Sequence, residues 1–311
     1  MSDSNRHPEP IRQVEFPSQG TRCHGWWLPS ASATPDSGAL VVMAHGLGGT
    51  VEGGLMPYAM ALQQADHSVL AFDYRHFGRS AGEPRQLLGI RRQQQDYLAA
   101  IDHARSLEPL RPLVLWGTSF SSAHVLQLAA RRRDIAAVIA MNPMLDGQAS
   151  SLVKLKDEGI GTFLRMTGAG LADLIRGSLG RSPHYIPLAG EPGTLAALTA
   201  PDALEGIQRF AGDDFDNRIA PRALLALGLY RPVKIAHRLS CPLLLQLCLR
   251  DSVTPISPGY RLADILKDRI TLKTYDTGHF AIYESPWQPR LAEDQANFLA
   301  HLCQRPSQRF G

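Results

Sequence analysis

Cysteine is scarce in this chain: the four cysteines among 311 residues are Cys23, Cys241, Cys248 and Cys303. No CxxC pair or other metal-ligand spacing connects them, so we expect neither a disulfide framework nor a structural metal centre. No run reaches the roughly 18 consecutive apolar residues that a membrane-spanning helix requires. The first ten residues, MSDSNRHPEP, lack the apolar segment of a secretory signal peptide. Together these absences predict a cytoplasmic protein with reduced thiols and no membrane span.

Long blocks of one charge are also missing. The chain has 32 Lys and Arg against 29 Asp and Glu, for a net charge of +3. The densest basic group, Arg131-Arg132-Arg133, falls at the end of a predicted helix, where cations offset the helix dipole. We therefore expect no nucleic-acid partner. A content of 44% hydrophobic and 20% charged residues is typical of a globular protein, and the length suits one large domain or a domain with an insertion.

Several short apolar runs predict β-strands. The runs with the sequences ALVVMA, PLVLW, IAAVIAM and PLLLQLCL are apolar without alternation, which is typical of parallel strands covered on both faces. The predicted strands are Ile11–Phe16, Cys23–Leu28, Ala39–Ala44, Ser68–Phe72, Leu113–Trp116, Ile135–Met141, Pro242–Leu249 and Ile270–Tyr275.

Helical patterns fill most of the gaps between these strands. The predicted helices are Leu55–Ala65, Ile90–Leu107, Ser121–Arg132, Pro258–Leu266 and Leu291–Leu302. The alternation predicts an α/β fold, with a mostly parallel eight-stranded sheet flanked by helices. Residues 146–230 break the rhythm with short helices separated by Gly and Pro, and they are too long for a loop. We interpret 146–230 as an inserted helical cap on a core of residues 1–145 and 231–311.

Ser119 stands where a predicted strand stops and a helix begins, in Gly117-Thr118-Ser119-Phe120-Ser121. A nucleophile elbow needs this location, with small residues two places on either side of the nucleophile. The usual pattern is G-x-S-x-G, and here Ser121 replaces the second glycine. The alternative is a serine that merely caps the helix.

A glycine-rich turn, His45-Gly46-Leu47-Gly48-Gly49, follows the third predicted strand. Acyl transfer requires backbone N–H donors that stabilise an oxyanion, and we assign this role to the amides of Leu47 and Phe120. A phosphate-binding loop is excluded because neither Gly-Lys-Ser/Thr nor GxGxxG is present. We interpret His45 as a structural histidine rather than a base.

A base and an acid follow late in the chain. His279 lies in a loop after the last predicted strand, and Asp251 comes directly after a fully apolar strand. The carboxyl ends of strands are where open α/β sheets meet their ligands. Asp146 is an alternative acid, whereas Asp276 is too near His279 along the chain to orient it. The sequence thus predicts a catalytic set in the order Ser119, Asp251, His279.

These segments resemble the alpha/beta-hydrolases over about residues 11–302. The motifs that carry the resemblance are HGLGG, FDYRHFGRS, WGTSFS, RDSVTP and GHF, in that order. Within the superfamily the chain is most similar to bacterial hydrolases of the X-prolyl dipeptidyl peptidase and dienelactone-hydrolase-like groups. It departs from their pattern at His76, where glycine is usual, and at Ser121-Ser122-Ala123 after the elbow. The loop DYRHFGRS is expected to be structural, like the packed pair Trp26-Trp27.

The resemblance implies a serine hydrolase that needs no cofactor or metal. Serine at position 119 favours esters, thioesters, lactones or amides over the substrates of relatives with aspartate or cysteine there. An apolar acyl or alcohol group is expected, because the cap is rich in Leu and Ala and contains Phe163, Met166, Tyr185, Phe210 and Phe215. The run Leu224–Leu229 is predicted to be a core helix of the cap rather than pocket wall.

Alternatives remain open at this stage. An amidase or peptidase would need an acidic anchor, for which Asp213, Asp214 and Asp216 are candidates, although a solvated turn is the favoured interpretation of GDDFDN. An acyltransferase or a non-hydrolytic module could use the same fold. The sequence leaves the oligomeric state open, with a homodimer as one possibility.

Overall fold

The computed structural model describes residues 10–32 and 38–304. It is built on an eight-stranded sheet with the order β1-β2-β4-β3-β5-β6-β9-β10. The fold prediction is confirmed, because each predicted run coincides with one strand and every pairing from β4 across to β10 is parallel. The strands are β1 Arg12–Ser18, β2 Thr21–Leu28, β3 Leu40–Ala44, β4 Ser68–Phe72, β5 Leu113–Thr118, β6 Ile135–Met141, β9 Leu243–Cys248 and β10 Ile270–Tyr275.

The first two strands form an antiparallel edge. Gln19 and Gly20 join them with φ angles of 49° and 79°, as a two-residue hairpin turn requires. β2 then pairs antiparallel with β4, so the parallel part of the sheet begins only at β4. Trp26 and Trp27 of β2 are buried on opposite sides of the sheet, which confirms their packing role.

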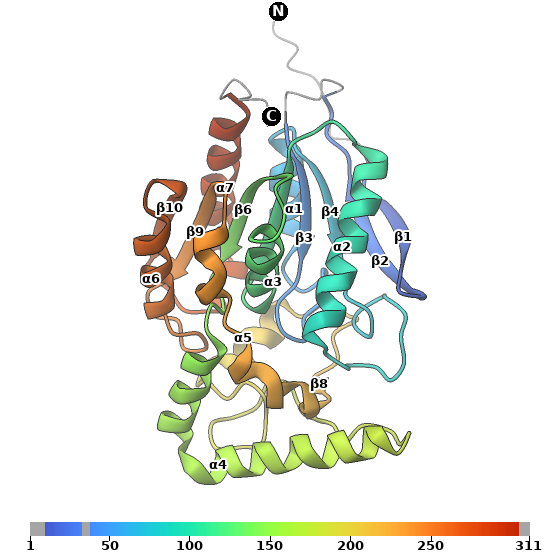
Figure 1. Ribbon diagram of the computed structural model, residues 1–311, viewed down its shortest axis with the longest axis vertical. Coiled ribbons are helices and arrows are strands. Elements are labelled where there is room, and N and C mark those ends of the chain that lie inside the picture. Colours follow the sequence, from blue (N-terminus) through green and yellow to red (C-terminus); the bar gives the residue numbers. More distant parts are fainter. Residues whose placement is uncertain (1–9, 33–37, 305–311) are drawn as a thin grey trace, which may run out of the picture.

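Helices cover both faces of the sheet (Figure 1). α1 (Met56–Gln64) and α7 (Trp287–Gln304) contact each other on one face. α2 (Ile90–Leu107), α3 (Phe120–Ala129) and α6 (Ser257–Leu266) lie on the other. Side chains of β3 alternate between two apolar clusters, with Val42 in one and Val41 in the other. The continuous apolar runs of the sequence therefore serve two cores at once.

A long segment between β6 and β9 lies beyond the carboxyl ends of the central strands (Figure 1). Its longest element, α4, is kinked at Gly159, where φ is 80°. Two short strands form a pair that the sequence did not indicate. The elements are α4 Gly147–Ser178, β7 Ile186–Pro187, α5 Ala203–Phe210, β8 Arg218–Ile219 and the 3₁₀ helices η2 Pro221–Leu229 and η3 Pro232–Arg238. Two further 3₁₀ turns, η4 Lys267–Arg269 and η5 Ala281–Tyr283, flank β10.

Candidate active site

Ser119 forms the tight turn between β5 and α3. Its φ of 50° and ψ of −115° are a strained conformation for a residue with a side chain, and such strain is typical of a nucleophile elbow. A Cβ at Gly117 would lie 2.7 Å from the backbone of Ser121, so only glycine fits there. The side chain of Ser119 makes no capping hydrogen bond to α3, which argues against the simple helix cap.

The serine that replaces the second elbow glycine is accommodated by a neighbouring loop. Ser121 is fully buried, and its hydroxyl lies 2.8 Å from the Tyr74 hydroxyl. Tyr74 belongs to the DYRHFGRS loop, which is structural as expected: Tyr74 and Phe77 are fully buried outside the pocket lining. The departure from G-x-S-x-G is therefore compensated by a buried hydrogen bond.

Three sequence-predicted residues from three strand ends meet at one place. His279 Nε2 lies 3.2 Å from Ser119 Oγ, and His279 Nδ1 lies 2.7 Å from Asp251 Oδ2. The side chains of Asp251 and His279 are almost completely buried. A nucleophile touching a base, with the base oriented by a carboxylate, is the geometry that activates a serine hydroxyl.

Asp251 is held ionised by its surroundings. Burial opposes the charge, but the adjacent His279 and the backbone N–H donors of Val253 and Thr254 outweigh burial and lower its pKa. The Val253 and Thr254 amides lie 2.8 and 2.7 Å from Oδ1, and the Thr254 hydroxyl donates to Oδ2 at 2.9 Å. Asp251 can thus fix the histidine with Nδ1–H toward the carboxylate, leaving Nε2 to accept a proton.

The glycine-rich turn after β3 lies against the elbow. A Cβ on Gly46 would lie 3.2 Å from Ser119 Cβ, so the backbone of this turn passes close to the nucleophile. Leu47 and Phe120 both line the pocket, and Phe120 is the first residue of α3, where backbone N–H groups have no partner within the helix. The assignment of these two amides to an oxyanion hole stays a prediction, and the closeness of both segments to Ser119 is compatible with it.

His45 supports this turn instead of acting as a base. Its Nδ1 bonds the Gly46 carbonyl at 2.9 Å, and its Nε2 accepts from the Tyr74 amide at 3.3 Å. Burial lowers the pKa of His45 to about 4, so the ring is neutral near pH 7. The structural interpretation of His45 is confirmed.

The alternative acids are engaged elsewhere. Asp146 caps the N-terminus of α4 and forms a two-point ion pair with Arg231, at 2.8 Å for each contact. Asp276 is exposed beside Arg250. Among the candidates for an amine anchor, Asp214 accepts from Thr50 at 2.9 Å, and none of Asp213, Asp214 and Asp216 lines the pocket.

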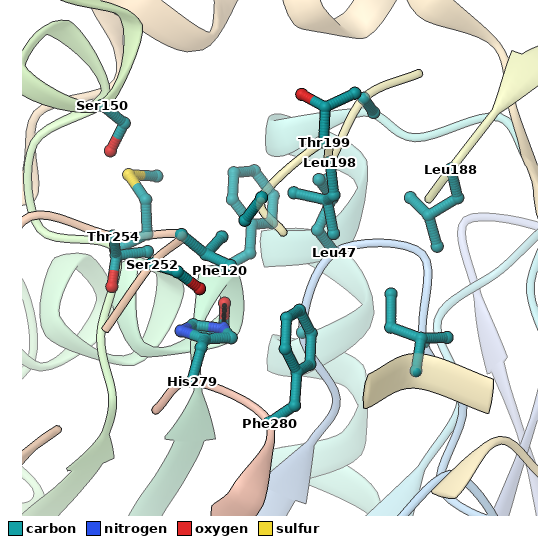
Figure 2. A pocket seen from close by; sticks show the side chains of 18 of the residues that line it. Leu47, Phe120, Ser150, Leu188, Leu198, Thr199, Ser252, Thr254, His279 and Phe280 are labelled. Atoms are coloured by element: carbon teal, nitrogen blue, oxygen red, sulfur yellow. Dashed lines mark hydrogen bonds between the residues drawn. The ribbon is translucent and has the colours of Figure 1, made fainter. Parts of the chain in front are cut away.

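A cavity of about 480 Å³ opens above Ser119 and His279. Figure 2 shows Leu47, Leu188, Leu198 and Phe280 around one part of it, and Ser150, Ser252 and Thr254 around another. Segments of 147–230 supply much of the wall, including Leu224 and Leu227 of η2. The prediction of a core helix at Leu224–Leu229 was wrong, because the segment is a 3₁₀ helix that lines the pocket and exposes 86% of Leu229.

Comparisons with known proteins identify the family of this chain. Residues 35–183 match the family model described as Serine aminopeptidase, S33. The chain is 38% identical to Quorum-quenching protein AidA of Acinetobacter baumannii (strain MDR-ZJ06), over 96% of this chain and 97% of the relative. The chain belongs to the alpha/beta-hydrolase superfamily. The narrower placement in the X-prolyl dipeptidyl peptidase and dienelactone-hydrolase-like groups stays a prediction.

This alpha/beta-hydrolase is also similar to two further proteins. It is 28% identical to Thiohydrolase aneE of Aspergillus aculeatus, over 50% of this chain and 49% of the relative. It superposes on alpha/beta hydrolase GrgF of Penicillium sp. sh18 with a TM-score of 0.77 at 22% identity, over 95% of this chain and 99% of that one. The second similarity supports the fold, and together the relatives support a hydrolase.

Sequence reasoning missed the residues that support the histidine of this hydrolase. Asn142 Nδ2 donates to the His279 carbonyl at 3.1 Å, and Thr118 Oγ1 donates to Asn142 Oδ1 at 2.9 Å. The Tyr283 hydroxyl lies 2.7 Å from Thr118 Oγ1 and completes the chain of bonds. Nothing local in the sequence signals this network, because its members come from the end of β5, the residue after β6 and the segment after β10.

Polar groups of α4 were missed as well. Lys154 Nζ lies 2.7 Å from Glu158 Oε1 and 2.7 Å from Thr199 Oγ1, and all three residues line the pocket. The described residues, 10–32 and 38–304, contain no group of three His, Cys, Asp or Glu that could hold a metal. Within the same residues, no helix is both long and apolar enough to cross a membrane.

Proposed function

We propose that this alpha/beta-hydrolase cleaves a carboxylic ester, thioester or lactone through an acyl-enzyme on Ser119. The observation that carries the proposal is the contact series Ser119 Oγ–His279 Nε2 and His279 Nδ1–Asp251 Oδ2, at 3.2 and 2.7 Å. No other described residue set joins a strained serine, a buried base and a buried carboxylate at the mouth of a cavity.

The proposed reaction has two halves. Ser119 Oγ attacks the carbonyl carbon while its proton passes to His279 Nε2, and Asp251 stabilises the resulting imidazolium. The carbonyl oxygen becomes an oxyanion that accepts hydrogen bonds from the Leu47 and Phe120 amides, each worth about 3 kcal/mol. His279 then protonates the leaving group as the tetrahedral intermediate collapses. Water repeats the sequence on the acyl-enzyme, releasing the acid and restoring Ser119.

The substrate we propose is a small molecule with an apolar acyl or alcohol group. Most of the wall is apolar, including Leu188, Leu198 and Phe280, so a hydrocarbon gains free energy by leaving water there. The thiohydrolase relative supports thioesters as members of the substrate class. The quorum-quenching relative supports a small diffusible substrate rather than a polymer. We also propose that residues 146–230 act as the cap that closes this pocket.

A series of p-nitrophenyl esters from acetate to palmitate tests the proposal. Wild type should hydrolyse them with an optimum acyl length, whereas Ser119→Ala should lose activity at every length. Ser106→Ala is the matched control, because Ser106 is exposed at the end of α2 and bonds only the His103 carbonyl. Equal activity of wild type and Ser119→Ala would refute the assignment of Ser119. A wild type inactive on every ester and on thioester analogues would refute the substrate class.

A further inference from the structure

The second half of α4 presents apolar side chains to solvent. Beyond the kink at Gly159, its buried residues Thr162, Ala169 and Asp173 face η2, against which the helix packs. The opposite side should be polar in a helix at a protein surface. Instead it carries Ile160, Leu164, Leu171 and Ile175, and Leu179 follows at the C-cap; the exposed fractions of these five residues lie between 48% and 62%. Figure 1 shows this part of α4 as a long rod along the edge of the molecule.

The exposed apolar area is large for a monomer. Phe163 and Leu174, also exposed, flank the same stripe. Seven half-exposed side chains of this size present on the order of 600 Å² of apolar surface, at the upper end of the largest patches on typical monomers. With the backbone and small residues between them, the surface approaches the roughly 800 Å² that each partner buries in a stable complex.

Small residues on the stripe make it complementary to itself. Gly161, Gly168 and Ala172 are exposed on the same side of α4. A Cβ added at Gly161 or Gly168 would meet nothing within 4 Å, so packing inside the chain does not require glycine there. When a second copy of the helix runs antiparallel about Gly168, residues equally distant from Gly168 face each other. Gly161 then opposes Ile175 and Leu164 opposes Ala172, so two of the large side chains meet small ones, while Leu171 meets Arg165 and Ile160 meets Arg176.

Charges at the two ends of this helical segment favour the same antiparallel arrangement. Asp157 is exposed at the corner before Gly159, whereas Arg176 and Arg181 lie near the other end. Antiparallel pairing brings Asp157 of one copy toward these arginines of the other, and parallel pairing would place like charges together. A lipid surface fits less well. An interfacial helix carries several Lys and Arg along a free polar face, whereas residues 160–175 of α4 contain one cation, Arg165, and the side opposite the stripe is buried.

We propose that the exposed face formed by residues 160–178 of α4 and its C-cap Leu179 binds a second copy of this chain, with the two helices antiparallel about a two-fold axis at Gly168. A two-fold interface uses the same patch on both subunits, as this self-complementary stripe does. The inference does not depend on the hydrolase activity.

Molar mass in solution tests the proposal first. Light scattering at micromolar concentration should give twice the chain mass of 34.0 kDa for wild type. Gly168→Leu should give the mass of one chain with an unchanged helix signal, because the new side chain has open space in the protomer and raises helix propensity. Leu110→Ser, which removes an exposed leucine between α2 and β5, should stay dimeric.

Cysteine cross-linking tests the register. In a Cys303→Ser background, Gly168→Cys should form an interchain disulfide on mild oxidation, because the two copies of residue 168 meet on the axis. Leu179→Cys alone should not, since antiparallel pairing separates its two copies by about 33 Å. A wild type that is monomeric at tens of micromolar overturns the proposal, and monomers that sediment with phosphatidylglycerol vesicles would assign the face to lipid. A dimer that survives Gly168→Leu without cross-linking at residue 168 places the interface elsewhere.

Discussion

Replacing Asp251 with asparagine should disable catalysis while leaving the fold in place. The amide oxygen can take the position of Oδ1, where it still accepts from the Val253 and Thr254 amides at 2.8 and 2.7 Å. The amide NH₂ then takes the position of Oδ2 and faces His279 Nδ1, now 2.7 Å away as a second donor. The opposite orientation is worse, because the NH₂ group would face two backbone N–H donors.

The imidazole must respond by moving its proton. Nδ1 becomes the acceptor, Nε2 carries the hydrogen, and Nε2 can no longer take the Ser119 proton across their 3.2 Å contact. The loss expected for a wrong tautomer is about 10⁴-fold in kcat, which equals about 5.4 kcal/mol of activation free energy. KM should change far less, because Asp251 does not line the pocket.

The assay compares kcat and KM of wild type and Asp251→Asn on the best ester of the p-nitrophenyl series at pH 7. Circular dichroism and urea midpoints establish that both proteins are folded. A folded Asp251→Asn protein whose kcat stays within about tenfold of wild type would contradict the role given to Asp251, since one decade is only about 1.4 kcal/mol.

Three further predictions follow from other parts of the molecule. Burial lowers the pKa of His124 to about 3, so the folded protein excludes a proton that the unfolded chain binds below about pH 6.5, and stability falls as the pH falls. Between pH 6.5 and pH 5, the free energy of unfolding of His124→Gln should therefore fall by about 2 kcal/mol less than that of wild type, as measured by urea denaturation. Equal decreases in the two proteins would contradict the lowered pKa of His124. Leu224→Trp, which fills the cavity wall, should lower kcat/KM at least tenfold for long esters but not for acetate; a uniform loss would contradict the pocket assignment. Asn142→Ala removes the 3.1 Å bond to the His279 carbonyl and should reduce kcat about 10- to 100-fold with little change in KM. An unchanged kcat would show that the loop carrying His279 keeps its position without this bond.

The sheet could be predicted because its evidence is local. ALVVMA is apolar at every position and PLLLQLCL at every position but Gln246, and runs of this length bounded by turn residues are typical of strands covered on both faces. Ser119, Asp251 and His279 could be found for a related reason. Each follows a recognisable strand, and parallel strands bring their carboxyl ends to one edge.

The parts that sequence reasoning missed depend on contacts between distant segments. Leu224 reads as a core residue from its neighbours, but its position against the cavity depends on how η2 packs on α4. Asn142 follows β6 as an unremarked polar residue, and its bond to His279 spans 137 positions of the chain. The same limit applied to residues 146–230. We predicted short helices there, but α4 continues for 32 residues through the kink at Gly159, because its packing on η2 is not visible in the local sequence.

The measurement that tests the account most directly is covalent labelling with a fluorophosphonate, read by intact mass and peptide mapping. Wild type should take up one label per chain, located on Ser119, and the label should appear faster than on any other serine because His279 activates this hydroxyl. Ser119→Ala should take up none. Labelling at another serine, or no labelling of active, folded wild type, would contradict the claim that Ser119 is the nucleophile.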